Sequence, residues 1–261
     1  MQPYRNTKVA HMRLIDRIVA SSRTRMRRYQ LGLYRPFGRK TALIPRVSGQ
    51  EIELSLPKSE PQVHEHEFWK ILIDDCYGLY SVRKPVRTVL DVGANVGLFG
   101  LAARHRFPQA AIHCYEPNLN LQTHLHANLS RFNIQVWPEA VGLESGRVYL
   151  KSEGNSLHTR VFEDHLGDVS VTPFRLAIER LGGAIDVLKL DCEGAEWKLF
   201  EARELWTQVR FLTMEYHLWA EPGLTIADLF NTLHKLGFRV RRHQPSLNGT
   251  FGLVWADSVL H

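Results

Sequence analysis

The spacing of apolar residues predicts strands and helices in alternation from Thr88 to near the end of the chain. Short apolar runs, typical of strands buried on both faces, recur between segments with helical periodicity. The predicted strands cover 88–92, 111–116, 134–141, 185–191 and 209–215, and the predicted helices cover 95–106, 118–131, 173–181, 194–205 and 225–236. Such alternation is typical of a doubly wound parallel sheet with helices on both faces.

A predicted hairpin closes the chain. Two apolar segments, 238–242 and 250–256, are joined by a short loop that contains Pro245, Asn248 and Gly249. We expect these segments to pair as antiparallel strands. With the five strands before them, they complete a predicted α/β fold with a seven-stranded, Rossmann-like sheet.

Weaker patterns precede this core and interrupt it. Helical spacing extends over 8–34 and 63–82, apolar and polar residues alternate over 51–56, and a short extra strand is predicted at 147–151. The polar segment 151–168 shows neither period and is predicted to be an irregular substrate loop. The chain is therefore divided into an N-terminal arm (1–50), a cap region (51–87) and a core (88–261).

Composition adds limits on the class of protein. The chain has 261 residues, of which 44% are hydrophobic, enough for one domain of ordinary size with or without an added arm. No apolar run approaches the roughly 20 residues that span a bilayer. Three widely separated cysteines suit a reducing compartment. We therefore expect a cytoplasmic protein without a transmembrane segment.

Charge is unevenly distributed along the chain. Residues 1–46 contain 12 Lys and Arg against one acid, Asp16, which leaves 21 basic and 26 acidic residues for the remainder. The arm could contact an anionic surface, such as a membrane or a nucleic acid. The alternative, which we favour, is a solvated helix packed on the domain. The basic total charge thus belongs to the arm and not to the core.

The most informative segment is 88–100, where a buried strand ends in a glycine turn and a helix begins. Gly93 allows a tight turn, Gly97 allows close approach to the backbone, and Asn95 can cap the helix. Glu116 follows 19 residues after Gly97 at the end of the next strand. This spacing is typical of an acid that binds a ribose, so the segment predicts a nucleoside cofactor.

The residues of the turn also indicate which cofactor is bound. A dinucleotide site prefers three glycines to hold a pyrophosphate, whereas Asn95 occupies the position of the second glycine here. Asp91 begins the turn, and its carboxylate would repel a pyrophosphate. The same carboxylate would attract the ammonium group of S-adenosylmethionine (SAM). The turn therefore favours SAM over NAD.

Four segments in this order resemble the FkbM-type SAM-dependent methyltransferases. They are LDVGANVG at 90–97, YEPN at 115–118, EAVG at 139–142 and DVLKLDCEGAE at 186–196, and the resemblance covers about 60–240. It implies a class I methyltransferase fold, SAM as cofactor, and O-methylation of a hydroxyl on a natural product or carbohydrate. With the residues discussed above, it assigns cofactor binding to Asp91, Gly93, Asn95, Gly97, Glu116, Pro117, Asn118, Glu139 and Ala140.

Titratable side chains gather where two predicted strands end. Asp191 and Glu193 follow one strand, and Glu215 and His217 follow its expected neighbour. Ligands of open α/β sheets bind at these carboxyl ends, so we predict Asp191, Glu215 and His217 to be catalytic. An unperturbed histidine has a pKa of about 6.5, which favours His217 as the base. Glu193 could equally cap the next helix.

Several alternatives stay open. Asp191, Glu193 and Glu215 could hold a divalent metal that lowers the pKa of the acceptor hydroxyl, although the resemblance does not require one. The predicted function is O-methylation of a small or carbohydrate hydroxyl. The alternatives are an RNA methyltransferase guided by the basic arm and a SAM-binding scaffold without turnover. The acidic core weighs against RNA, and the catalytic set weighs against the scaffold.

Overall fold

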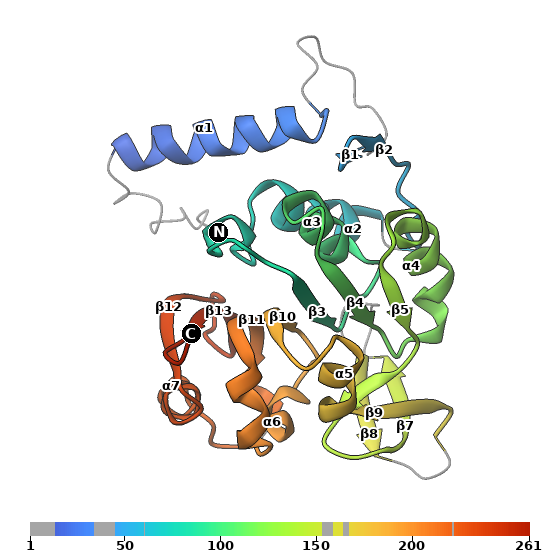
Figure 1. Cartoon of the computed structure of the whole chain (residues 1–261), viewed down its shortest axis with the longest axis vertical. Coiled ribbons are helices and arrows are strands. Elements are labelled where there is room, and N and C mark those ends of the chain that lie inside the picture. Colours follow the sequence, from blue (N-terminus) through green and yellow to red (C-terminus); the bar gives the residue numbers. More distant parts are fainter. Residues whose placement is uncertain (1–13, 34–44, 60, 153–158, 164–166, 221) are drawn as a thin grey trace, which may run out of the picture. The chain divides into compact units, whose positions relative to one another are not determined.

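Figure 1 shows the computed structural model of the chain, in which residues 14–33, 45–59, 61–152, 159–163, 167–220 and 222–261 are described. The chain forms two compact units, Met1–Glu53 and Leu54–His261. In the first unit, α1 (Leu14–Gln30) precedes a hairpin of β1 (Arg46–Val47) and β2 (Gln50–Glu51). The strand predicted for 51–56 is wrong beyond Glu51, because β1 is too short to pair with more of it.

The second unit is built on a seven-stranded sheet. Its order is β12-β13-β11-β10-β3-β4-β5. The parallel strands are β3 (Thr88–Val92), β4 (Ala111–Tyr115), β5 (Gln135–Trp137), β10 (Ile185–Leu190) and β11 (Val209–His217). β13 (Phe251–Ser258) runs antiparallel between β11 and β12 (Phe238–Pro245). The predicted class I methyltransferase sheet with its C-terminal hairpin is confirmed.

The order of this sheet determines where a ligand can bind. From β3 the chain proceeds outward through β4 and β5, and it then returns to place β10 on the other side of β3. The strand order therefore reverses between β3 and β10. Connections at such a reversal diverge above and below the sheet and leave a crevice at the carboxyl ends of the strands.

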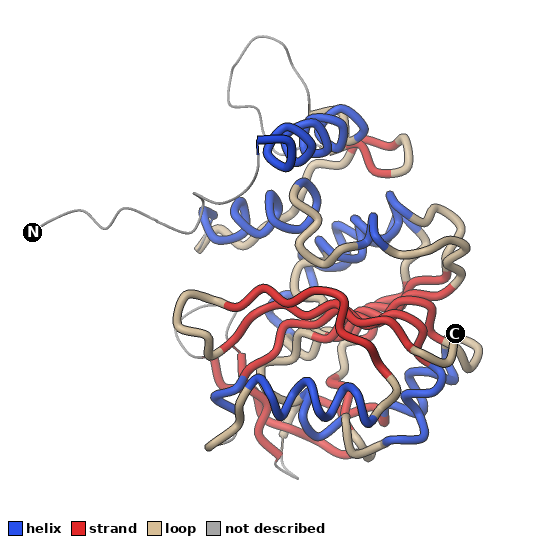
Figure 2. Tube along the Cα trace, turned by 90° about the vertical axis from the view of Figure 1, so that its left-hand side faces the viewer, coloured by secondary structure: helices blue, strands red, loops and turns tan. Residues whose placement is uncertain are grey.

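Helices cover both faces of the sheet. α2 (Pro61–Phe68), α3 (Leu98–Arg106) and α4 (Gln122–Leu129) lie on one face, and α5 (Phe174–Arg180), α6 (Glu196–Leu199) and α7 (Ile226–Lys235) lie on the other (Figures 1 and 2). A π-helical turn covers Trp69–Ile73, and 3-10 turns cover Leu79–Ser81, Leu119–Leu121, Ser130–Phe132, Arg203–Gln208 and Leu218–Ala220. Within the described ranges, no helix has both the length and the apolar character needed to cross a membrane.

Two predicted helices are interrupted. The helix predicted over 63–82 stops at Ile73, where the π-helical turn ends. The helix predicted over 194–205 stops at Leu199, whose carbonyl accepts a hydrogen bond of 2.9 Å from the fully buried indole of Trp206. The same carbonyl also accepts a hydrogen bond from Ala202 N (3.3 Å), and the chain then enters the 3-10 turn that carries Trp206. The backbone and the indole of Trp206 thus share the last carbonyl of α6.

A second sheet adjoins the first, with the strand order β6-β9-β7-β8. Its strands are β6 (Ala140–Gly142), β7 (Gly146–Ser152), β8 (Thr159–Glu163) and β9 (Val169–Pro173). The strand predicted for 134–141 is divided between the two sheets at Pro138, which has no N–H to donate to a ladder. The irregular loop predicted for 151–168 is wrong where β8 forms, and residues 153–158 and 164–166 of that loop lie outside the described residues.

The buried side chain of Asn128 ties three segments of the second unit together. Its Oδ1 accepts a hydrogen bond from Ser55 N (2.8 Å), and its Nδ2 donates to Ser55 O (3.0 Å) and Val96 O (2.8 Å). Val96 belongs to the turn between β3 and α3. α4 thus holds that turn and the segment before α2 in place.

We expect Asn128→Ala to lower the free energy of unfolding by about 1–3 kcal/mol, because it leaves buried backbone groups of Ser55 and Val96 without a partner. Urea unfolding followed by circular dichroism measures this change. His126→Ala, at an exposed position on the same helix, is the matched control and should change stability by less than about 0.5 kcal/mol. Equal stability of Asn128→Ala and the parent would contradict the role assigned to this amide.

Candidate active site

The turn after β3 passes directly against the end of β10. Gly93 N and Ala94 N both donate to Tyr115 O, each at 3.0 Å, which ties the turn to the end of β4. Gly93 has a φ of +79°, and a Cβ at this position would lie 1.8 Å from Asp191 O. Only glycine fits, so the predicted tight turn at Gly93 is confirmed.

Glu116, directly after β4, is held by backbone N–H groups of the turn after β3 and of the segment that follows β4. Its Oε2 accepts from Asn95 N (2.7 Å) and its Oε1 accepts from Asn118 N (2.8 Å). Burial raises the pKa of this carboxyl to about 7, although both N–H groups act in the opposite direction. Each oxygen keeps lone pairs beyond these bonds when the group is ionised. The geometry suits a carboxylate that accepts further hydrogen bonds from a ligand.

The other predicted cofactor residues divide into two sets. Gly93, Asn95, Glu116, Pro117, Glu139 and Ala140 line one cavity of about 1130 Å³. Gly97 packs against α4 instead, where a Cβ would lie 2.8 Å from Leu129 Cγ. Asn118 caps the 3-10 turn that follows it, accepting from Asn120 N at 3.0 Å. Asn95 does not cap α3, because Gly97 occupies the N-cap position of that helix.

Asp91 is also placed differently from the prediction. Its side chain is fully buried beneath the turn, and its Oδ1 lies 3.3 Å from the Lys189 ammonium. Burial raises the pKa of Asp91, and Lys189 opposes that shift. Lys189 Nζ also donates to Gly93 O at 2.5 Å. Asp91 therefore acts on the turn through Lys189 and does not line the cavity.

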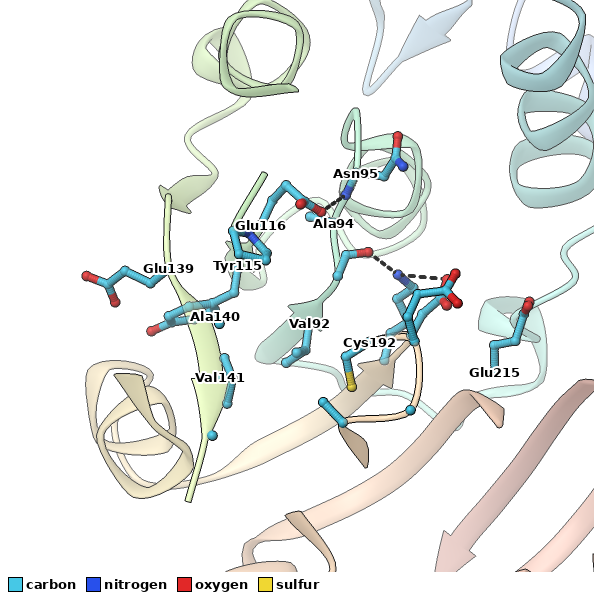
Figure 3. A pocket seen from close by; sticks show the side chains of 18 of the residues that line it. Val92, Ala94, Asn95, Tyr115, Glu116, Glu139, Ala140, Val141, Cys192 and Glu215 are labelled. Atoms are coloured by element: carbon cyan, nitrogen blue, oxygen red, sulfur yellow. Dashed lines mark hydrogen bonds and ion pairs between the residues drawn. The ribbon is translucent and has the colours of Figure 1, made fainter. Parts of the chain in front are cut away.

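The cavity has two chemically different ends. Figure 3 shows Glu116 and Glu139 on one side of the pocket and Glu215 on the other. We call the first the nucleoside end, defined by Gly93, Glu116, Glu139 and Ala140. We call the second the acidic end, defined by Asp191, Glu193 and Glu215, where Lys70, Tyr77, Trp219 and Phe251 complete the walls.

At the nucleoside end, the carboxylate of Glu139 is already paired. Its Oε2 accepts from Arg180 Nη1 at 2.7 Å and also contacts the hydroxyl of Thr172. The Arg180 guanidinium lies 3.8 Å from the centre of the Trp137 ring, and that ring stacks on Tyr115. The sequence analysis missed Arg180, which has no motif of its own. Of this layered group, Tyr115 and Glu139 line the cavity beside Ala140.

His217 lies at the centre of the acidic residues. Its side chain is 3% exposed, with Nδ1 3.0 Å from Glu196 Oε1 and Nε2 3.6 Å from Glu193 Oε2 and 3.7 Å from Glu215 Oε1. Burial lowers the pKa of the imidazole, but the contacts with the carboxylates of Glu196 and Glu215 outweigh it and raise the pKa to about 11. With no cation bound, these carboxylates favour the protonated imidazole, which does not act as a free base at neutral pH.

Asp191 and Glu215 line the cavity on either side of this histidine. Asp191 Oδ2 accepts from Tyr77 OH (2.8 Å) and lies 3.5 Å from Lys189 Nζ. Burial opposes ionisation of Asp191, but Lys189 and His217 prevail and lower its pKa. For Glu215, burial and then the charge of Asp191 raise the pKa. The structure thus brings the predicted catalytic residues together, with Tyr77 as a partner that the sequence did not indicate.

Comparison with known proteins connects this site to a family. The methyltransferase FkbM domain matches residues 91–240. AMB antimetabolite synthetase AmbE of Pseudomonas aeruginosa is 39% identical over 80 residues, which cover 30% of this chain and 4% of that protein. Methyltransferase sdnD of Sordaria araneosa is 26% identical over 66% of this chain and 81% of that protein. The chain therefore spans a small part of the first relative and most of the second.

Solved structures also resemble the chain. Magnesium protoporphyrin IX methyltransferase ChlM of Synechocystis PCC 6803 has a TM-score of 0.47 and 12% sequence identity. The similarity covers 78% of this chain and 85% of that chain.

We propose that the ionised form of Glu116 accepts the ribose hydroxyls, and because its pKa is about 7, we expect the affinity for SAM to fall by about tenfold between pH 8 and pH 6. Isothermal titration calorimetry at several pH values measures this. The amino group of the cofactor also titrates near this range. Glu116→Gln is therefore the reference: it should bind more weakly at pH 8 and lack this part of the pH dependence. Identical pH profiles for the parent and Glu116→Gln would exclude Glu116 as the ribose ligand.

Proposed function

Because the chain belongs to the FkbM methyltransferase family, we propose that it transfers a methyl group from SAM to a hydroxyl of a small natural product or carbohydrate. The observation that carries the proposal is the single cavity that joins the nucleoside end to the acidic end. A methyl donor held at one end would present its reactive group to an acceptor at the other.

The nucleoside end fits the cofactor by shape and by hydrogen bonding. Gly93, Ala94 and Asn95 line the cavity, so a ligand can approach the backbone of this turn closely. The ionised Glu116 can accept hydrogen bonds from both ribose hydroxyls. Three carboxylates at the other end, those of Asp191, Glu193 and Glu215, favour a positively charged sulfonium nearby.

The acidic end suits a neutral, hydroxyl-bearing acceptor. Carboxylates accept hydrogen bonds from hydroxyls, and Tyr77, Trp219 and Phe251 offer apolar faces in the same wall. A polyanion such as RNA would place its phosphates near the same carboxylates and be repelled. The chemistry of the wall therefore favours the small acceptor over the nucleic acid.

We assign the role of base to Glu215 in place of His217. Glu215 lines the cavity and is one of the residues at the carboxyl end of β11, whereas His217 is enclosed by carboxylates. When bound, SAM would supply an electrophilic methyl group: the acceptor oxygen would attack the methyl carbon as the C–S bond breaks and its electron pair stays on sulfur. Glu215 takes the proton of the acceptor hydroxyl as the new O–C bond forms. Asp191, fixed by Tyr77 and Lys189, holds the acceptor in line.

We expect Glu215→Gln to reduce kcat by about 10²–10⁴-fold, because the amide cannot accept the proton, while the affinity for SAM stays unchanged. Transfer of labelled methyl groups to a panel of hydroxyl metabolites, with RNA included, measures turnover.

The matched control for this experiment is Glu179→Gln, which removes an exposed acid on α5 that does not line the cavity. It should behave like the parent. Near-normal turnover of Glu215→Gln would reject Glu215 as the base. Transfer to RNA and to no small hydroxyl compound would reject the proposed acceptor class.

A further inference from the structure

Three side chains at the acidic end have the geometry of a metal site. Asp191, Glu215 and His217 each offer one ligand atom, and these three atoms lie within 4.8 Å of one another. They come from the carboxyl ends of the neighbouring strands β10 and β11. We propose that these residues bind a divalent cation at the point where the acceptor hydroxyl would lie. The existence of this cation site does not depend on the proposed function, but its role in the reaction rests on that function.

The orientation of His217 is an independent observation in favour of a cation. Its Nδ1 lies 3.0 Å from Glu196 Oε1, and that carboxylate is fully buried and fixed by hydrogen bonds from His217 N (3.0 Å) and Gly194 N (2.9 Å). A buried carboxylate on one ring nitrogen is the usual support of a metal-binding histidine, because it directs the other nitrogen at the ion. Here it directs Nε2 toward Glu215.

The distances on the other side of the ring are consistent with this orientation. Nε2 lies 3.7 Å from Glu215 Oε1 and 3.6 Å from Glu193 Oε2, and both separations are too long for hydrogen bonds. Two ligands that share one ion, each about 2.1 Å from it, are about 3.0–3.5 Å apart. The nitrogen and the Glu215 oxygen are therefore close to this separation without any rearrangement of the backbone.

The charge of the group also favours a cation. Four carboxylates surround His217, those of Asp191, Glu193, Glu196 and Glu215. Lys189 lies 3.5 Å from Asp191, but it is shared with the buried Asp91. Buried carboxylates need nearby positive charge, because water no longer solvates them. A divalent ion would supply two charges at the place where the carboxylates converge.

The donor set restricts the identity of the ion. Two carboxylates and one imidazole suit Mn²⁺, Fe²⁺ or Zn²⁺, and suit Mg²⁺ less well because it prefers oxygen ligands throughout. An ion here would polarise the acceptor hydroxyl and stabilise its oxygen as the proton leaves. Glu215 would bind through Oε1 and keep its second oxygen to receive that proton.

Binding of Mn²⁺ to the full-length protein tests the inference without relying on activity. The protein is treated with chelator and dialysed, and Mn²⁺ is then titrated and followed by electron paramagnetic resonance. We expect one bound ion per chain in the parent and in Glu179→Gln. Glu215→Gln should bind at least about tenfold more weakly, and Glu196→Gln about 10–100-fold more weakly through loss of the support to His217. Unchanged SAM affinity in each variant shows that the fold is retained.

The outcomes separate this inference from the proposed function. Equal Mn²⁺ binding by the parent and Glu215→Gln, or no Mn²⁺ or Zn²⁺ binding by the parent, would overturn the cation site. Full methyl transfer to a hydroxyl after chelation would overturn the role of the cation in the reaction, while supporting the proposed reaction itself. One Mn²⁺ lost in Glu215→Gln, in a protein that methylates no hydroxyl compound, would support the site and reject the proposed reaction.

Discussion

The buried ammonium of Lys189 is the contact on which the arrangement of the site depends. Lys189 and Asp91 are paired residues in the register of β10 and β3, so their side chains emerge on the same face of the sheet. The ammonium lies 3.3 Å from Asp91 Oδ1, 3.5 Å from Asp191 Oδ2 and 2.5 Å from Gly93 O. A buried charge without such partners would be strongly destabilising. The pairing therefore selects one register and fixes the glycine turn against the end of β10.

Electrostatic asymmetry along the cavity follows from this arrangement. At the nucleoside end, Glu116 is held by backbone N–H groups and Glu139 is neutralised by Arg180. At the acidic end, carboxylates outnumber the cations that contact them, so a positive group is favoured there. A sulfonium carried by the cofactor and a cation bound by the protein would both meet this requirement. We propose that this asymmetry orients the cofactor and concentrates the chemistry at the acidic end.

Asp91 and His217 show that the position of a residue at the end of a strand does not fix its role. Both were singled out because they lie at the end of a strand beside a predicted ligand. Asp91 is enclosed with Lys189, and His217 is enclosed with Glu196 and its neighbours. Asp91 therefore acts through Lys189, whereas His217 keeps Nε2 for the proposed cation. Position along a strand indicates that a side chain is near the site, but its partners determine whether it can reach a ligand.

The sequence by itself determined the seven-stranded sheet, the glycine turn and the acid at the end of β4, because local periodicity and short spacing encode burial and chain reversal. Only the tertiary structure decided the partners. Tyr77 lies 114 residues before Asp191, and Arg180 lies 41 residues after Glu139. The second sheet likewise depends on pairing between segments that are separated in the sequence, such as β6 and β9. Such contacts are set by strand register and by packing of bulky groups such as Trp206, and neither leaves a periodic signal in the sequence.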